Sequence, residues 1–168
     1  MAENQDAIAL LKEDHDKVEA LFKQYENASG DGRKEKLAKQ ICTELTVHAM
    51  IEEEIFYPAC EGKVEDELLK EAYVEHDAAK VLIAQIEQGE PSDEFYDAKV
   101  KVLQEEIEHH VEEEEKRMEG LFSQARKAGI DMDKLGQQLA SRKSELMRQA
   151  ESGALPAPQL TTMEGTSA

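Results

Sequence analysis

Apolar side chains recur every three or four residues along four stretches of the chain. The stripes cover positions 8–25, 41–59, 69–86 and 100–121. This spacing is typical of an α-helix with one buried face. Glycine, proline and small polar residues between the stripes predict loops at 27–32, 61–63 and 89–92. Four helices joined by short loops favour an all-α fold, an up-down-up-down antiparallel four-helix bundle.

The last part of the chain predicts an additional C-terminal helix. A weaker break at 128–131 precedes a helical stretch at 131–150, with an apolar stripe that Arg142 interrupts. We expect this helix outside the bundle or at an interface. Residues 152–168 are rich in glycine, proline, serine and threonine, which predicts a disordered tail. The predicted units are therefore a bundle at 1–128, an appended helix at 129–151 and a tail at 152–168.

Each of the four stripes carries a histidine near its middle, where leucine or isoleucine is expected: His15, His48, His76 and His110. Two of them are followed four residues later by a glutamate, Glu52 or Glu114. Residues spaced by four lie on the same helix face, so both glutamates are expected to point inward. The bundle would then hold four imidazoles and two carboxylates in its core.

Such a cluster needs a counter-charge, because an unpaired buried charge costs several kcal/mol, roughly a large part of a domain's stability. No lysine or arginine lies on the same stripes, whereas a multivalent cation would neutralise the glutamates and satisfy the imidazoles. Imidazole and carboxylate without thiolate suit Fe, Mn, Zn, Cu or Ni. Six ligands are too many for one tetrahedral zinc ion and suit two ions bridged by carboxylates.

Composition limits the partners. The 168 residues include 38 acids and 20 bases, for a net charge of −18, which disfavours nucleic acids and anionic membranes. The chain shows no secretory signal pattern and no apolar run long enough for a membrane span, so we expect a cytoplasmic protein.

Cys42 and Cys60 are expected to be small buried side chains. Core positions are also expected for Phe22, Phe56, Met118 and Phe122.

The motifs that carry these histidines resemble those of hemerythrin-like proteins, the HHE cation-binding domain family. They are Leu-Lys-Glu-Asp-His at 11–15, His-Ala-Met-Ile-Glu at 48–52, Glu-His-Asp at 75–77 and His-Val-Glu-Glu-Glu at 110–114. The resemblance covers about residues 5–125. It implies a non-haem centre of two Fe ions with an oxo or hydroxo bridge. By the same resemblance Glu52 and Glu114 would bridge the ions, and the four histidines would be terminal ligands.

The chain departs from the oxygen-carrying hemerythrins at Lys80, where those proteins have a further histidine. Water, the bridge or another side chain would have to replace that ligand, with Tyr73 and Tyr25 as tyrosine candidates. Those proteins also have an acid five residues after the fourth-helix histidine. Here Glu115 holds that position, but Glu114 repeats the spacing of the second helix and is preferred.

His109 is an alternative to its neighbour His110, but it lies about 100° off the stripe. The other acids near the histidines are expected mainly at the surface, Asp14 and Asp77 among them. Some of them could accept an imidazole N–H.

Two functions follow from this site. The first is a di-iron protein that binds or reacts with dioxygen, peroxide or nitric oxide. The alternative is an iron buffer, store or sensor without turnover. Whether the protein is an enzyme stays open, and the 131–150 helix is a possible contact for a second copy or another protein.

Overall fold

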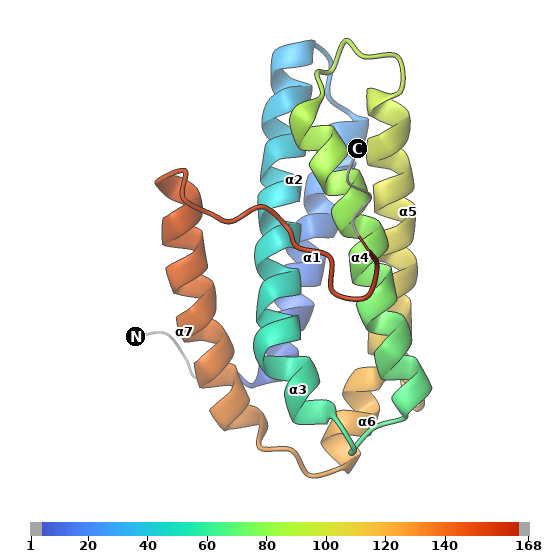
Figure 1. The fold of residues 1–168 in the computed structure, drawn as a ribbon, viewed down its shortest axis with the longest axis vertical. Coiled ribbons are helices and arrows are strands. Elements are labelled where there is room, and N and C mark those ends of the chain that lie inside the picture. Colours follow the sequence, from blue (N-terminus) through green and yellow to red (C-terminus); the bar gives the residue numbers. More distant parts are fainter. Residues whose placement is uncertain (1–4, 165–168) are drawn as a thin grey trace.

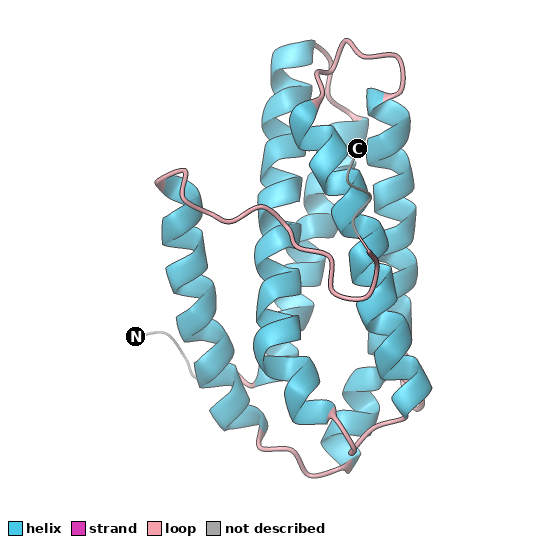
Figure 2. Cartoon of the chain, viewed as in Figure 1, coloured by secondary structure: helices cyan, strands magenta, loops and turns pink. Residues whose placement is uncertain are grey.

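The computed structural model describes residues 5–164 and leaves residues 1–4 and 165–168 undescribed. The described chain is helical and contains no strand (Figure 2). Its elements are α1 (Ala7–Glu26), α2 (Asp31–Ile51), the π-helix η1 (Glu52–Phe56), α3 (Tyr57–Cys60), α4 (Asp66–Gln88), α5 (Tyr96–Glu115), α6 (Leu121–Lys127) and α7 (Met132–Glu151).

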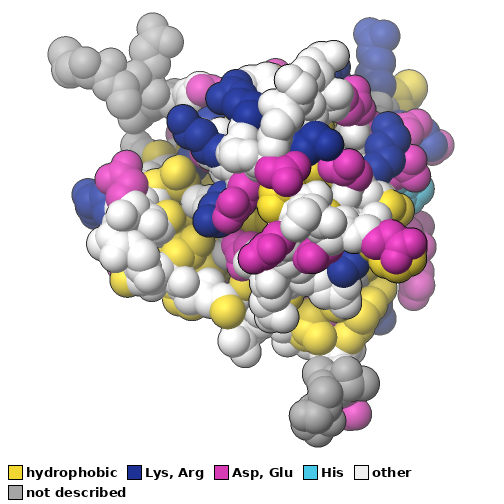
Figure 3. Space-filling model, turned by 90° about the horizontal axis from the view of Figure 1, so that it is seen from above, with side chains coloured by type: hydrophobic (Ala, Val, Ile, Leu, Met, Phe, Trp, Pro, Cys, Tyr) yellow, Lys and Arg dark blue, Asp and Glu magenta, His cyan; other side chains and the backbone are white. Residues whose placement is uncertain are grey.

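The four long helices α1, α2, α4 and α5 stand side by side and form the predicted bundle (Figure 1). Helix α1 packs on α2 and α5, and α4 packs on the same two neighbours. The all-α prediction is therefore confirmed. Figure 3 views the bundle from above and shows acidic and basic side chains interspersed at this surface.

The apolar core is divided into two clusters along the bundle. One includes Leu11, Ile51 and Phe122, and the other includes Phe22, Ile41 and Leu103. The buried histidines His15, His48, His76 and His110 belong to neither cluster. A polar layer thus lies at mid-height in the bundle, where each stripe has its histidine.

The second apolar stripe changes register at the π-helix η1. The α-helical spacing predicts that Ile55 and Ala59 face the core, but both are only partly buried. Phe56, Tyr57 and Cys60 are instead fully buried. In a π-turn the N–H bonds five residues back, as the Tyr57 N–H does to the Glu52 carbonyl. The extra residue in this turn rotates all later side chains relative to the predicted stripe.

The fourth stripe is broken where a continuous helix to residue 121 is expected. Helix α5 ends at Glu115, and α6 begins at Leu121. A β-carbon on Gly120 would lie 2.5–2.8 Å from backbone atoms of Lys116 and Glu114, so this close turn requires glycine. Met118 lies in the turn and is 72% exposed, so the prediction that it belongs to the core is wrong.

Helix α7 lies against the outside of the bundle and packs on α1, α2 and η1 (Figure 1). Its apolar stripe is buried there: Met132, Leu135, Leu139 and Leu146. Arg142, which interrupts the stripe, places its guanidinium 2.8 and 3.2 Å from the carboxylate oxygens of Glu54. The apolar side chains of α7 are therefore buried against the bundle of the same chain. Contact with a further protein through this helix stays a prediction.

Of the expected tail at 152–168, residues 152–164 are described and contain no helix or strand, and residues 165–168 lie outside the described residues. Residues 152–164 run back across α2 to α4 (Figure 1), and Thr161, Thr162 and Met163 donate hydrogen bonds to Asp77. The small and polar composition suggested disorder because such a segment buries little apolar surface. Here a buried carboxylate holds it by hydrogen bonds, which hydropathy does not measure.

None of the described helices is long and apolar enough to cross a membrane.

The docking of α7 yields a test of close packing. A β-carbon on Gly136 would overlap the backbone carbonyl oxygen of Gln5 and lie 3.0 Å from the Ala7 nitrogen. We expect Gly136→Ala to lower the free energy of unfolding by about 1–3 kcal/mol, because backbone cannot move aside cheaply. Urea unfolding measures this change.

Gly32→Ala is the matched control, because Gly32 lies in α2 with no atom within 4 Å of a new β-carbon. There alanine is expected to stabilise the protein by about 0.4–1 kcal/mol. Equal stabilisation by both substitutions would show that α7 does not pack as described.

Candidate metal centre

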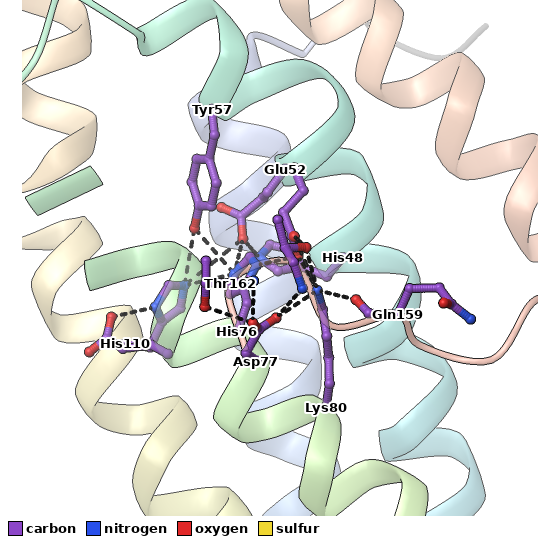
Figure 4. A network of polar contacts seen from close by, with 12 residues as sticks. His48, Glu52, Tyr57, His76, Asp77, Lys80, His110, Gln159 and Thr162 are labelled. Atoms are coloured by element: carbon purple, nitrogen blue, oxygen red, sulfur yellow. Dashed lines mark hydrogen bonds and ion pairs between the residues drawn. The ribbon is translucent and has the colours of Figure 1, made fainter. Parts of the chain in front are cut away.

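The six residues expected to bind metal come together inside the bundle. One group that could hold an ion consists of His15, His48, Glu52 and Glu114, and a second consists of Glu52, His76 and His110. All six are buried, with exposures of 7% or less. Figure 4 shows the Glu52 carboxylate directed toward His48 and His76, with His110 to the left of them. Glu52 belongs to both groups and so joins them.

The imidazoles form two pairs through their inner nitrogens. The Nε2 atoms of His15 and His48 are 3.2 Å apart, and those of His76 and His110 are also 3.2 Å apart.

The two glutamates connect these pairs. Glu52 Oε1 lies 2.9 Å from His48 Nε2 and 3.1 Å from His76 Nε2. Glu114 Oε1 lies 3.3 Å from His15 Nε2 and 3.2 Å from His110 Nε2. Each carboxylate therefore contacts one imidazole of each pair.

The outer nitrogen of each of the four clustered histidines faces a carboxylate from a neighbouring helix. The Nδ1–oxygen distances are 2.8 Å for His15–Glu115, 3.0 Å for His48–Asp14, 3.0 Å for His76–Glu53 and 2.9 Å for His110–Glu75. Since a carboxylate only accepts, each Nδ1 carries the proton and donates it. The Nε2 atoms, which point inward, are then free to offer lone pairs.

The protein alone can balance this cluster only with protons. Burial opposes a charge on His48, but the negative charges of Glu52 and Asp14 outweigh burial and raise its pKa to about 10. Burial likewise opposes a charge on His110, and Glu114 nevertheless moves its pKa well above the usual value. The site thus strongly favours positive charge at its centre.

A metal ion fits this environment better than protons do. Both Glu52 oxygens and Oε1 of Glu114 are buried without a hydrogen-bond partner, because their short contacts with Nε2 atoms lack hydrogen-bond geometry. Ligand atoms about 2.1 Å from one ion and at right angles to each other are about 3.0 Å apart. The measured 2.9–3.3 Å separations between Nε2 and Oε1 atoms match that spacing. These donors and distances suit metal coordination.

Tyr57 is a member of the site that the sequence did not reveal. Its hydroxyl donates to Glu114 Oε2 at 2.8 Å and lies 3.2 Å from His76 Nε2 and 3.3 Å from His110 Nε2. Tyr73 and Tyr25, the expected candidates, do not reach these nitrogens: Tyr73 packs on the ring of Tyr57, and the Tyr25 hydroxyl donates to Asp97. The only signal in the sequence was that Tyr57 follows Glu52 by five residues. This spacing places both side chains on one face in a π-turn but not in an α-helix.

Lys80 does not enter the metal site. Its ammonium lies 2.9 Å from Glu53 and 3.2 Å from Asp77, on the outer side of His76 (Figure 4). Glu53 in turn accepts from His76 Nδ1, so Lys80 neutralises the acid that orients a histidine. Lys80, which stands where the oxygen-carrying hemerythrins have a further histidine, therefore lies outside the cluster.

The structure shows which of His109 and His110, and which of Glu114 and Glu115, faces the cluster. The His110 side chain is 5% exposed and faces the cluster, whereas that of His109 is 64% exposed and contacts Glu75. Glu114 faces inward, and Glu115 binds His15 Nδ1.

Two acids expected at the surface are instead buried. Asp14 is 4% exposed, and Asp77 is fully buried. Asp14 binds both His48 and Lys143 of α7, so the appended helix contacts the surroundings of the site.

The fold and these residues define a metal-binding four-helix bundle. The sequence profile of the hemerythrin HHE cation binding domain matches residues 6–122, and the chain belongs to this family. The crystal structure of a hemerythrin HHE cation binding domain-containing protein from Mycobacterium kansasii has a similar fold, with a TM-score of 0.71 and 20% identity. The match covers 89% of this chain and 94% of that one.

A curated relative, a DNA nickase of Nostoc sp., is 30% identical over 106 residues. The match covers 63% of this chain, which spans only 30% of the nickase's length.

Metal is expected to stabilise the fold. A chelator is first used to remove bound metal and is then itself removed. Adding Zn²⁺ should raise the free energy of unfolding by about 4 kcal/mol when the free ion reaches about 1,000 times its dissociation constant. His110→Ala should abolish most of this gain, because it removes an inward Nε2. Urea unfolding with and without Zn²⁺ measures the difference.

His109→Ala is the neighbouring control and should keep the full gain, because His109 is exposed. If the two variants respond equally to Zn²⁺, the ion binds elsewhere.

Proposed function

We propose that the protein holds two iron ions in this cluster and binds or reacts with small oxygen or nitrogen species there: dioxygen, peroxide or nitric oxide. The observation that carries the proposal is the connection of two histidine pairs by two glutamates, since each glutamate contacts one imidazole of each pair. One ion would not need that arrangement.

The ligands divide naturally between two positions. His15 and His48 would hold one ion, and His76 and His110 the other, with Glu52 and Glu114 shared. Tyr57 lies beside the second pair, where its hydroxyl would replace the further histidine that Lys80 displaces. Both positions would then have protein ligands beyond the two imidazoles.

Iron supplies reversible one-electron redox chemistry. The chain's own residues orient the imidazoles and shield the centre. The acids at Nδ1 fix each ring and increase the basicity of its Nε2. Phe122 stacks on the His15 ring with 5.8 Å between the ring centroids.

A largely apolar cavity of about 430 Å³ adjoins the four histidines, with walls that include Val18, Leu45 and Ile83. Small uncharged species partition readily into such a space. This cavity supports the proposed class of ligand.

The test is iron content together with optical spectroscopy. We expect two irons per chain after expression in iron-rich medium, with near-ultraviolet bands that bleach on anaerobic reduction and return when oxygen is added. Glu52→Gln should reduce iron below one per chain, because Glu52 belongs to both metal groups.

Glu54→Gln is the control, since Glu54 is exposed and pairs with Arg142. It should keep both irons. Two irons without any spectral response to oxygen would instead favour the iron buffer, store or sensor. One iron per chain, or zinc alone, would contradict the two-iron proposal.

A further inference from the structure

The segment that follows α7 forms one wall of the cavity beside the histidines. Residues Pro156, Ala157, Pro158, Gln159 and Thr161 line it, opposite side chains from the four bundle helices. The rest of this cavity belongs to the bundle, so this wall is the only part made by a segment without helix. We call residues 155–163 the strap.

The strap is fixed to α4 by a buried carboxylate. Asp77 is fully buried and accepts from the backbone nitrogens of Thr161, Thr162 and Met163 at 2.9, 2.6 and 2.9 Å. The Thr162 hydroxyl adds a fourth hydrogen bond at 2.7 Å. Three successive backbone donors around one carboxylate form an anion-binding concavity. Exposed side chains elsewhere on the strap make no comparable contact.

Lys80 provides the second attachment. Its Nζ donates to the Gln159 carbonyl at 2.8 Å and to the Thr161 hydroxyl at 3.1 Å, as well as to Glu53 and Asp77 (Figure 4). The Thr161 hydroxyl also donates to Glu53, the acid that binds His76 Nδ1. The strap therefore contacts the same acid that orients a histidine of the cluster.

Hydrogen bonds hold the strap more than apolar packing does. Its residues are mostly exposed, and the partly buried Leu155, Pro158 and Leu160 are separated along the chain. Hydrogen bonds to Asp77, Lys80 and Glu53 thus hold the segment, and burial of apolar side chains contributes little. Such a segment can leave and return as a unit without disturbing the core.

We propose that the strap is a gate that controls which molecules reach the histidine cluster. In place, it walls the cavity and restricts access to small species. Released from Asp77 and Lys80, it opens a space whose volume of about 430 Å³ is sufficient for an organic molecule. This gate deepens the proposed function, because it takes the cluster as the reactive centre.

Thiol labelling in the full-length protein as purified tests the gate. Ala79→Cys places a thiol in the cavity wall, at a position that is 6% exposed. N-ethylmaleimide should modify it slowly. Adding Thr162→Pro removes two of the four hydrogen bonds to Asp77 and should raise the labelling rate at least tenfold. Adding Met163→Ala should leave the labelling rate unchanged, because Met163 does not line the cavity, its side chain is exposed and its backbone N–H to Asp77 remains.

Two internal measurements interpret the result. The native thiols of Cys42 and Cys60 are fully buried, so their labelling reports unfolding of the bundle. Hydrogen exchange of the Thr161 and Met163 amides reports release from Asp77. Faster amide exchange with an unchanged labelling rate for the A79C thiol would overturn the gate.

If Thr162→Pro also exposes the native thiols, Thr162→Ala replaces it, since it removes only the hydroxyl donor. A smaller rise in labelling is then expected, and no rise would overturn the proposal. The assay requires neither iron nor reaction with oxygen. Failure of the gate is therefore distinguishable from failure of the proposed function.

Discussion

Pairing between imidazoles and carboxylates of different helices is the interaction on which the rest of the structure depends. His15 of α1 bonds to α5, His110 of α5 to α4, His76 of α4 to η1, and His48 of α2 back to α1. The four bonds close a ring around the bundle. Rotating or sliding any one helix would break two of them and leave buried charge unpaired, which is costly. Apolar packing favours a bundle, and this ring fixes the rotation and height of each helix.

The ring has an internal symmetry that follows from local sequence. Helices α1 and α4 each carry an acid directly before the histidine, Asp14-His15 and Glu75-His76. Glu114 and Glu115 follow His110 of α5 by four and five residues, and Glu52 and Glu53 of η1 follow His48 of α2 at the same spacing. In each pair of acids one faces the centre and the other faces a neighbour's Nδ1. Many of the acidic side chains near the site thus serve to hold the histidines. Three basic side chains pair with the acids on its outer side: Lys80, Arg142 and Lys143.

The sequence was sufficient for the parts of the molecule that depend on helical periodicity. The four inward histidines and both inward glutamates follow from α-helical spacing, and the structure places all six together. Features that break this periodicity could not be found in the same way. Tyr57 reaches the cluster through a π-turn, and Met118 is exposed because the chain turns closely at Gly120. The attachment of the strap to Asp77 could not be predicted from composition, because backbone N–H groups, which every sequence has, make most of these bonds.

The π-helix at Glu52–Phe56 has a consequence for comparing relatives. It contains one residue more than an α-helix needs to span the same rise, so it behaves as a one-residue insertion absorbed without a loop. A relative whose helix lacks the π-turn would be one residue shorter here, although its histidine and glutamate motif would look the same. An ungapped alignment would then pair Tyr57 with a side chain about 100° away around the helix. The chain length between the two motifs therefore indicates whether a tyrosine reaches the histidines. A residue-by-residue comparison that ignores this length would assign the wrong residue to the position of Tyr57.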